Sequence, residues 1–253
     1  MADVLRFGAG LARFLEHRGL AVPQLAERAG LGAGQLRAVL DGAEPGDAAL
    51  RALAGALGLH AVDLFALAGV AAPQDLAPLD PGARRSVEHL VVDAVRCPEA
   101  QRLELLGLVR AVPQQRRPAE FELGPLAPVS GGPGGAVIRM LRYRNLHLTG
   151  MAKVLAFTTP TYLSAATYGV IGRGTEELTP RRITDFAAVL GFDARELAAL
   201  TGVELTAEPE PPYPAAEYAA GLLWAARRLS AAQAEELAGT ARAMARAQRN
   251  GGG

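Results

Sequence analysis

The chain has 253 residues, 50% of them hydrophobic and only 5% aromatic, so its core must be built mainly from Leu, Val and Ala. Its 26 basic and 26 acidic residues cancel, which lends no support to DNA binding, because many DNA-binding domains are basic. The single cysteine excludes an intrachain disulfide and a cysteine-cluster metal site. With no signal-peptide pattern and no apolar run of about 18 residues, we expect a cytoplasmic protein without membrane contact.

The first part of the chain predicts five short helices, because apolar residues recur at helical spacing between glycine and proline breaks. Asp47 can act as N-cap of the fourth helix and Gly58 ends it. The five helices are expected at about 5–17, 23–29, 33–40, 47–57 and 63–67.

The same order recurs later in the chain, which indicates an internal duplication. Leu25-Ala26 aligns with Met151-Ala152 at an offset of 126 residues, and Leu57-Gly58 aligns with Leu190-Gly191 at an offset of 133. We place the increase of seven within residues 167–179, which predicts a longer loop after the third helix of the second copy. Residues 96–110 align with 228–242 at an offset of 132, within the helical hairpin that follows each copy.

These patterns divide the chain into five segments. The linker is defined by its many Pro and Gly residues, which leave little to bury. The segments are a first helix-turn-helix module (1–72), a helical hairpin (80–112), the Pro/Gly-rich linker (113–135), a second, divergent module (136–205) and a C-terminal helical hairpin (215–248).

A family signature lies in the first module. It consists of Arg18-Gly19-Leu20, Leu25-Ala26, Gly30-Leu31, Gly42, Leu53-Ala54 and Leu57-Gly58. On these residues, 5–70 resemble the Cro/C1-type (Xre-family) helix-turn-helix domain, and 137–203 resemble a divergent copy. The tandem arrangement is similar to regulators common in actinobacteria. The resemblance implies an all-α fold with two lambda-repressor-like modules, and a sequence-specific transcriptional regulator that binds double-stranded DNA, commonly as a homodimer.

The resemblance places base-reading side chains on the third helix of each module, where Gln suits adenine and Arg suits guanine. The first module's third helix opens Gly32-Ala33-Gly34, which weakens it. The second module is expected to have a polar third helix and a local surplus of eight basic over five acidic residues between 136 and 203. The expected base readers are Gln35, Arg37, Thr159, Thr161 and Ser164.

Phosphate contacts are expected from residues near the same helices. Thr158 has an N-cap role as an equal alternative, and each cation has a solvated surface position as the alternative. Arg139, Arg142 and Arg144 could also flank the groove. The expected phosphate contacts are Gln24, Arg28, Lys153, Thr158, Arg173 and Arg181.

The alternative function is a protein-interaction scaffold built from degenerate helix-turn-helix modules, which would bind a partner protein through its helical hairpins. Trp224 is then either a core anchor or an interface residue. A weaker third hypothesis is a ligand-responsive regulator. The four histidines lack ligand spacing, Cys97 has no activating neighbour, and no catalytic constellation is present in the sequence, so we expect no metal, no cofactor and no enzymatic activity.

Overall fold

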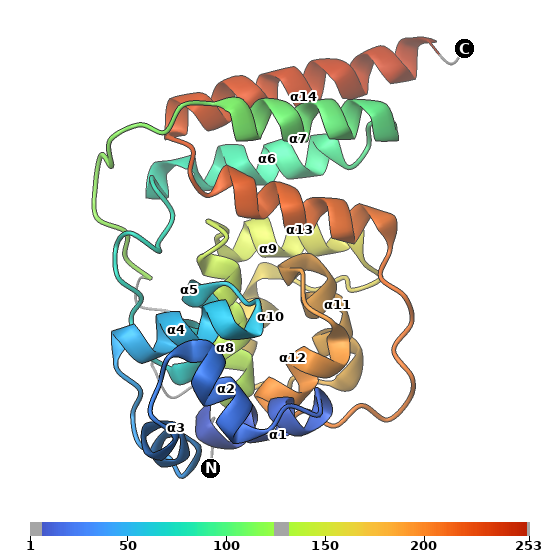
Figure 1. Ribbon diagram of the computed structural model, residues 1–253. Coiled ribbons are helices and arrows are strands. Elements are labelled where there is room, and N and C mark those ends of the chain that lie inside the picture. Colours follow the sequence, from blue (N-terminus) through green and yellow to red (C-terminus); the bar gives the residue numbers. More distant parts are fainter. Residues whose placement is uncertain (1–6, 124–131, 252–253) are drawn as a thin grey trace.

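The computed structural model describes residues 7–123 and 132–251, and every regular element in them is a helix (Figure 1). The predicted all-α class is therefore confirmed. Two units of five helices are each followed by a pair of helices, and the hairpin helices α6, α7 and α14 form the upper layer of Figure 1. The bounds of that layer are α6 Arg84–Ala94, α7 Glu99–Ala111 and α14 Ala231–Gly251.

The first unit, α1 to α5, follows the predicted spacing closely. Leu11, Phe14 and Leu15 bury one face of α1. Gly30 ends the second helix and Gly58 ends the fourth, each with a positive φ that a glycine adopts without strain. The helices are α1 Phe7–His17, α2 Val22–Ala29, α3 Ala33–Leu40, α4 Asp47–Leu57 and α5 Ala61–Ala68.

The second unit repeats this order as α8 to α12. Asn145, with a φ of 61°, occupies the turn position that Gly19 occupies in the first unit, where φ is 59°. Gly132 to Gly135, which we assigned to the linker, instead form the first turn of α8. The helices are α8 Gly132–Arg142, α9 Leu148–Thr158, α10 Ala165–Gly172, α11 Pro180–Leu190 and α12 Ala194–Thr201.

The predicted position of the third helix in the second unit is wrong. The helix α9 continues to Thr158, and α10 begins only after Ser164, whose hydroxyl oxygen accepts the N–H of Thr167 as a cap. The extra residues therefore lie before the third helix: α9 has 11 residues where α2 has 8, and the turn that follows is 159–164 where the first unit has 30–32. The loop after the third helix is nearly equal in the two units, at 41–46 and 173–179.

The hairpins exchange partners. The short helix η1 (Pro81–Ala83) leads into α6, which packs along α14, while α13 (Pro214–Ala226) packs along α7. Leu79 N–H donates to the carbonyl of Arg227 at 2.8 Å, which ties the two hairpins together at their base. The two predicted hairpins thus form one bundle.

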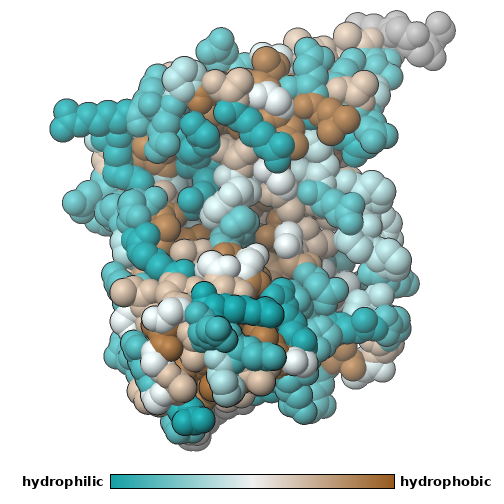
Figure 2. All heavy atoms as spheres, in the orientation of Figure 1, coloured by the Kyte–Doolittle hydropathy of each residue, from teal (hydrophilic) through white to brown (hydrophobic). Residues whose placement is uncertain are grey.

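Buried apolar residues from both units and both hairpins form one continuous core. Part of the predicted linker joins it, because Phe121 is buried and the Arg117 guanidinium donates to the carbonyls of Ala77 and Leu79 at 3.1 Å. Residues 124–131 of that linker lie outside the described residues. Hydrophilic residues predominate on the face in Figure 2, with hydrophobic ones in separate groups. None of the described helices combines the length and apolarity needed to cross a membrane.

Candidate functional site

The two five-helix units are held together by bonds that occur twice. Arg13 Nε, on α1, donates to the carbonyl of Ala199 on α12 at 2.9 Å. Arg139 Nε, on α8, donates to the carbonyl of Ala66 on α5 at 3.1 Å. Arg139 follows Arg13 by 126 residues and Ala199 follows Ala66 by 133, which are the offsets of the duplication. The same contact is therefore made in both directions across the interface.

A second matched pair extends this relation. Arg18 forms an ion pair with Glu196 at 2.6 Å and donates to the carbonyl of Leu57 at 2.6 Å. Its counterpart Arg144 forms an ion pair with Asp63 at 2.7 Å and donates to the carbonyl of Leu190 at 3.2 Å. All positions again match at the two offsets. The units thus meet as the subunits of a two-fold dimer do, within one chain.

The two ion pairs differ in burial. The side chains of Arg144 and Asp63 are 1% and 0% exposed, whereas those of Arg18 and Glu196 are 32% and 16% exposed. The guanidinium of Arg144 also lies 4.7 Å from the centre of the Trp224 ring. The interface is therefore dry on one side and partly wet on the other.

Three arginines considered as phosphate contacts are buried instead. Arg139, Arg142 and Arg144 are 3%, 6% and 0% exposed. Burial lowers the pKa of Arg139 and of Arg142. The prediction that these side chains flank a DNA groove is wrong, because all three are buried, and Arg139 and Arg144 bond across the interface between the units.

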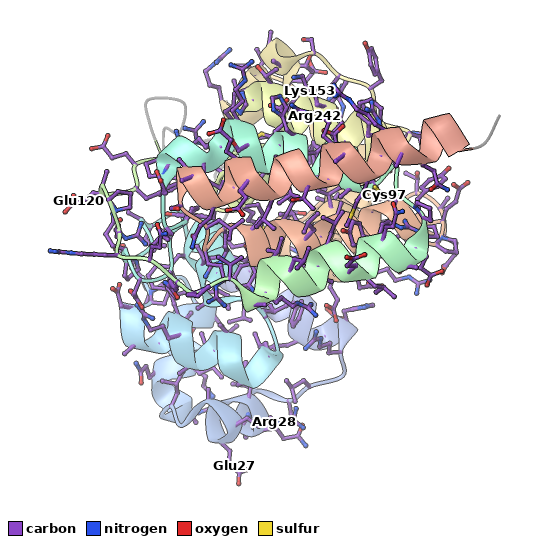
Figure 3. All side chains as sticks on the ribbon, turned by 90° about the horizontal axis from the view of Figure 1, so that it is seen from above. Glu27, Arg28, Cys97, Glu120, Lys153 and Arg242 are labelled. Carbon is purple, nitrogen blue, oxygen red and sulfur yellow. The ribbon has the colours of Figure 1, made fainter. Side chains whose placement is uncertain are left out.

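The surface formed by α2 and α3 of the first unit is open. Figure 3 shows Glu27 and Arg28 pointing away from the molecule at its lower edge. A Cβ added at Gly34 would meet no atom within 4 Å, so the backbone of α3 is accessible there. Four of the predicted contact residues lie exposed on this surface: Gln24, Arg28, Gln35 and Arg37.

Exposed acidic residues outnumber exposed basic ones between the start of α2 and the start of α4. The exposed basic residues of this stretch are Arg28 and Arg37. The exposed acidic residues are Glu27, Asp41, Glu44 and Asp47. The open surface of the first unit therefore has more negative than positive charge.

In the second unit the hairpins cover α9, the counterpart of α2. The helix α9 packs against α6 and α13. Among the described helices of the first unit, none packs as closely against α6 or α13. Lys153, the counterpart of Glu27, contacts Glu88 of α6 at 2.5 Å. Gly150, the counterpart of Gln24, and Val154, the counterpart of Arg28, are buried. Lys153 therefore binds protein at the position where the resemblance predicts a phosphate.

The predicted threonine readers of the second unit make contacts within the protein. Thr158 is buried and its hydroxyl donates to the carbonyl of Val154, while Thr159 donates to that of Leu155. Thr161 is buried and donates to Asp185 at 2.5 Å. Their predicted place on a third helix is wrong, since Thr158 ends α9 and the others lie in the turn. Of the other predicted contacts here, Ser164 caps α10, and Arg173 and Arg181 are exposed.

The sole tryptophan joins the second hairpin to the first unit. Trp224, on α13, is half-buried and its ring stacks on that of His60, with the centroids 3.4 Å apart. The guanidinium of Arg227 lies 3.9 Å from the centre of the same ring. Trp224 therefore acts as a packing anchor between α13 and the start of α5.

Titratable groups elsewhere do not form a metal centre in the part of the chain that the structure describes, which holds no cluster of three or more metal-ligating His, Cys, Asp or Glu side chains. Cys97 is buried, and burial raises the pKa of its thiol.

No family model, curated protein or solved structure matches the chain. The resemblance to the Cro/C1 type therefore depends on the residues of the chain alone.

Proposed function

We propose that this protein is a DNA-binding transcriptional regulator in which the first five-helix unit alone contacts DNA. In this proposal α2 and α3 form a helix-turn-helix, and α3 enters the major groove. The second unit acts as a built-in dimer partner that holds the first unit in place. DNA would then be contacted at a single half-site.

One observation carries the proposal: α2 is open in the first unit, whereas its counterpart α9 is covered by α6 and α13 in the second. Gln35 and Arg37 are exposed on α3, and these are side chains that can bind adenine and guanine edges. Arg28 is exposed on α2, where it can contact a phosphate. The bonds from Arg13 and Arg139 connect the second unit to the first.

The test is selection of duplexes from a random pool by the full chain, followed by fluorescence anisotropy with the enriched sequence. We expect Gln35→Ala and Arg37→Ala each to weaken binding and to relax the sequence preference, by about 1–3 kcal/mol for a bidentate contact. Arg28→Ala should weaken binding of all sequences to a similar degree. It should also reduce the slope of log K against log salt concentration by about one, since one phosphate contact is lost.

The duplication supplies matched controls. Thr167, on α10, is the counterpart of Gln35, and Arg173 is an exposed cation of the second unit. Substituting either with Ala should leave DNA binding unchanged. The proposal fails if no sequence is enriched, or if the variants of the first unit and the controls bind alike.

The acidic surplus on the open surface favours a second candidate, a protein-interaction scaffold that does not bind DNA. The surface that exposes Glu27, Asp41, Glu44 and Asp47 would then bind a basic partner. Replacing these four residues with their amides should strengthen any DNA binding. The same change should abolish capture of a protein partner on immobilised chain, so the two candidates predict opposite effects.

A further inference from the structure

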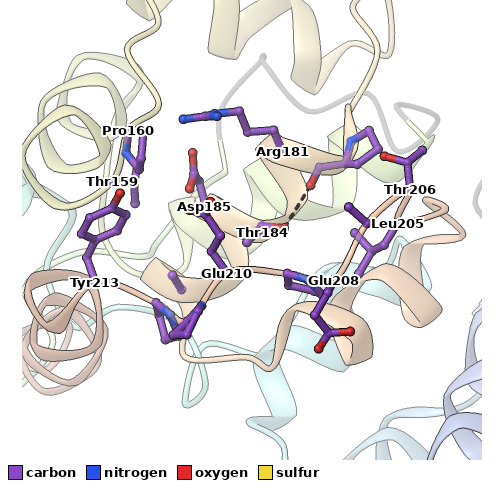
Figure 4. A pocket seen from close by; sticks show the side chains of 16 residues that line it. Thr159, Pro160, Arg181, Thr184, Asp185, Leu205, Thr206, Glu208, Glu210 and Tyr213 are labelled. Carbon is purple, nitrogen blue, oxygen red and sulfur yellow. Dashed lines mark hydrogen bonds between the residues drawn. The ribbon is translucent and has the colours of Figure 1, made fainter.

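A cavity of about 210 Å³ lies on the second unit, away from the open surface of the first. Its walls are α11, the turn that follows α9, and a Pro-rich segment at residues 205–213. In Figure 4, Arg181 extends over Asp185, and Tyr213 lies across from them beside Thr159. Charged and aromatic groups from three separate segments thus meet at one opening.

Asp185 is the buried charge of this cavity. It is 8% exposed and accepts one hydrogen bond, from the hydroxyl of Thr161. Burial raises the pKa of its carboxyl, and the hydrogen bond from Thr161 and then the charge of Arg181 oppose this effect. Among the described residues, no cationic side chain forms an ion pair or hydrogen bond with Asp185. A desolvated carboxylate without a bonded cation favours a cationic ligand group.

The rest of the lining supplies one cation, apolar surface and two further carboxylates, of which Glu208 is paired with Arg195 and Glu210 lies near Asp185. Arg181 is exposed, with its guanidinium available for a carboxylate. Pro160, Leu205 and Tyr213 contribute apolar surface and an aromatic ring. The volume is that of a small molecule.

The first unit shows that the fold does not require this cavity. The counterpart of Asp185 is Ala52, and Thr161 lies in the inserted turn, which has no counterpart. The segment equivalent to 205–213 is 72–80, which Arg117 holds against the core through backbone carbonyls. The same five helices therefore form with an alanine in place of the buried acid.

We propose that this cavity binds a small zwitterion of amino-acid type. Its ammonium group would pair with Asp185, its carboxylate with Arg181, and its side chain would lie against the prolines and Tyr213. The ligand would bridge the turn after α9 and the segment that leads into α13. The proposal is independent of the proposed DNA contact, because its residues all lie in the second unit and in the segment between α12 and α13.

The test is calorimetric titration of the full chain with each of the twenty L-amino acids, at up to about 10 mM, which would saturate a site with a Kd near 1 mM. For the amino acid that binds best, the amine lacking its carboxylate and the acid lacking its ammonium are titrated next. We expect at least one amino acid to bind, and both analogues to bind roughly tenfold more weakly or worse.

Two variants and a control locate the site. Asp185→Asn keeps the bond from Thr161 but removes the charge, and Arg181→Gln removes the second charge; each should weaken binding roughly tenfold or more. Arg173→Gln changes an exposed cation outside the cavity and should bind as the unaltered chain does. Circular dichroism establishes that each variant is folded. Absence of binding by all twenty amino acids, equal binding of the amine analogue, or normal binding by folded Asp185→Asn would overturn the proposal.

Discussion

The two units share a helical order and a set of interface bonds, yet they present opposite surfaces. In the first unit α2 and α3 are open, with Arg28 and Arg37 exposed. In the second unit the equivalent face of α9 lies under α6 and α13, and Lys153 is paired with Glu88. The difference teaches that two units of one helical order can keep matched interface bonds while only one of them keeps an accessible second helix.

Local charge and size explain why the hairpins cover one unit and not the other. Glu88 on α6 is 1% exposed and faces Lys153 and His147 of the second unit. In the first unit the position of Lys153 is occupied by Glu27, which would place a second carboxylate beside Glu88. A Cβ added at Gly150 would lie 3.4 Å from the carboxylate of Glu88. The glycine therefore leaves room for the close approach of the two helices.

The largest effect is expected at the buried half of the interface. Asp63→Ala leaves Arg144 without its anion in a site that is 1% exposed, and we expect the free energy of unfolding to fall by about 3–5 kcal/mol. Glu196→Ala breaks the matched pair on the wetter side, where Arg18 can turn to water, so the loss should be about 1 kcal/mol or less. Urea unfolding at pH 7 measures both.

Asp63→Asn serves as the control for size, since it keeps an oxygen acceptor for Arg144 and should lose less stability than Asp63→Ala. Equal losses for Asp63→Ala and Glu196→Ala would mean that the two sides of the interface are equivalent in solution. The contrast in burial would then have no energetic consequence.

A charge exchange at matched positions tests the covering of the second unit. Lys153→Glu places a carboxylate against buried Glu88, and we expect it to reduce the free energy of unfolding by about 2 kcal/mol, less than a fully buried pair because Lys153 is half exposed. Glu27→Lys, the matched change, alters an exposed residue and should have an effect within about 0.5 kcal/mol. Similar effects of the two changes would show that α6 does not cover α9 in solution.

Helix positions could be predicted largely from the sequence, because glycine caps and apolar spacing are local signals. Asp47 and Gly58 bound α4 as expected. The third helix of the second unit could not be placed, because the polar residues 158–164 resemble a helix start while their hydroxyls satisfy the backbone and Asp185. Local pattern does not show which turn holds an insertion.

The exposure of the expected contact residues could be predicted for the first unit and not for the second. Exposure of Gln35 and Arg37 follows from their position on an amphipathic helix. Covering of α9 depends on contacts with α6, about 65 residues earlier in the chain, and no local signal carries it. The repeated arginines were a usable signal that we missed: Arg13 and Arg18 recur as Arg139 and Arg144 at the same offset as the helices, which indicates a shared interface role.

A pH-dependent effect of about 1 kcal/mol is expected at His60, whose counterpart in the second unit is Asp193, the cap of α12. Desolvation, and then the charge of Arg144, lower the pKa of His60 to about 4. Because the unfolded chain takes up this proton near pH 6.5 and the folded chain does so only near pH 4, stability should fall as pH falls through that range. The loss is limited to about 1 kcal/mol because the ring is partly exposed and solvent screens it.

The readout is the fluorescence of Trp224, the sole tryptophan, which stacks on His60. Urea titrations at pH 7, 5.5 and 4 compare the unaltered chain with His60→Phe, which keeps the stacking but cannot be protonated. We expect the stability of His60→Phe to fall less over this range. Parallel curves would show that His60 does not contribute, and would leave His147, whose pKa is also lowered by burial, as the remaining histidine source.

The smallest effect in stability separates folding from function on α3. Gly34→Ala adds a Cβ that meets nothing within 4 Å at a helical position, so it should stabilise the first unit by about 0.5–1 kcal/mol; Ala166→Gly, the matched reverse change on α10, should destabilise by a similar amount. The protein therefore has no internal need for glycine at position 34. If α3 approaches DNA closely there, Gly34→Ala should weaken binding to the selected duplex while raising stability. A variant that is more stable and binds equally well would show that the opening of α3 is not a contact surface.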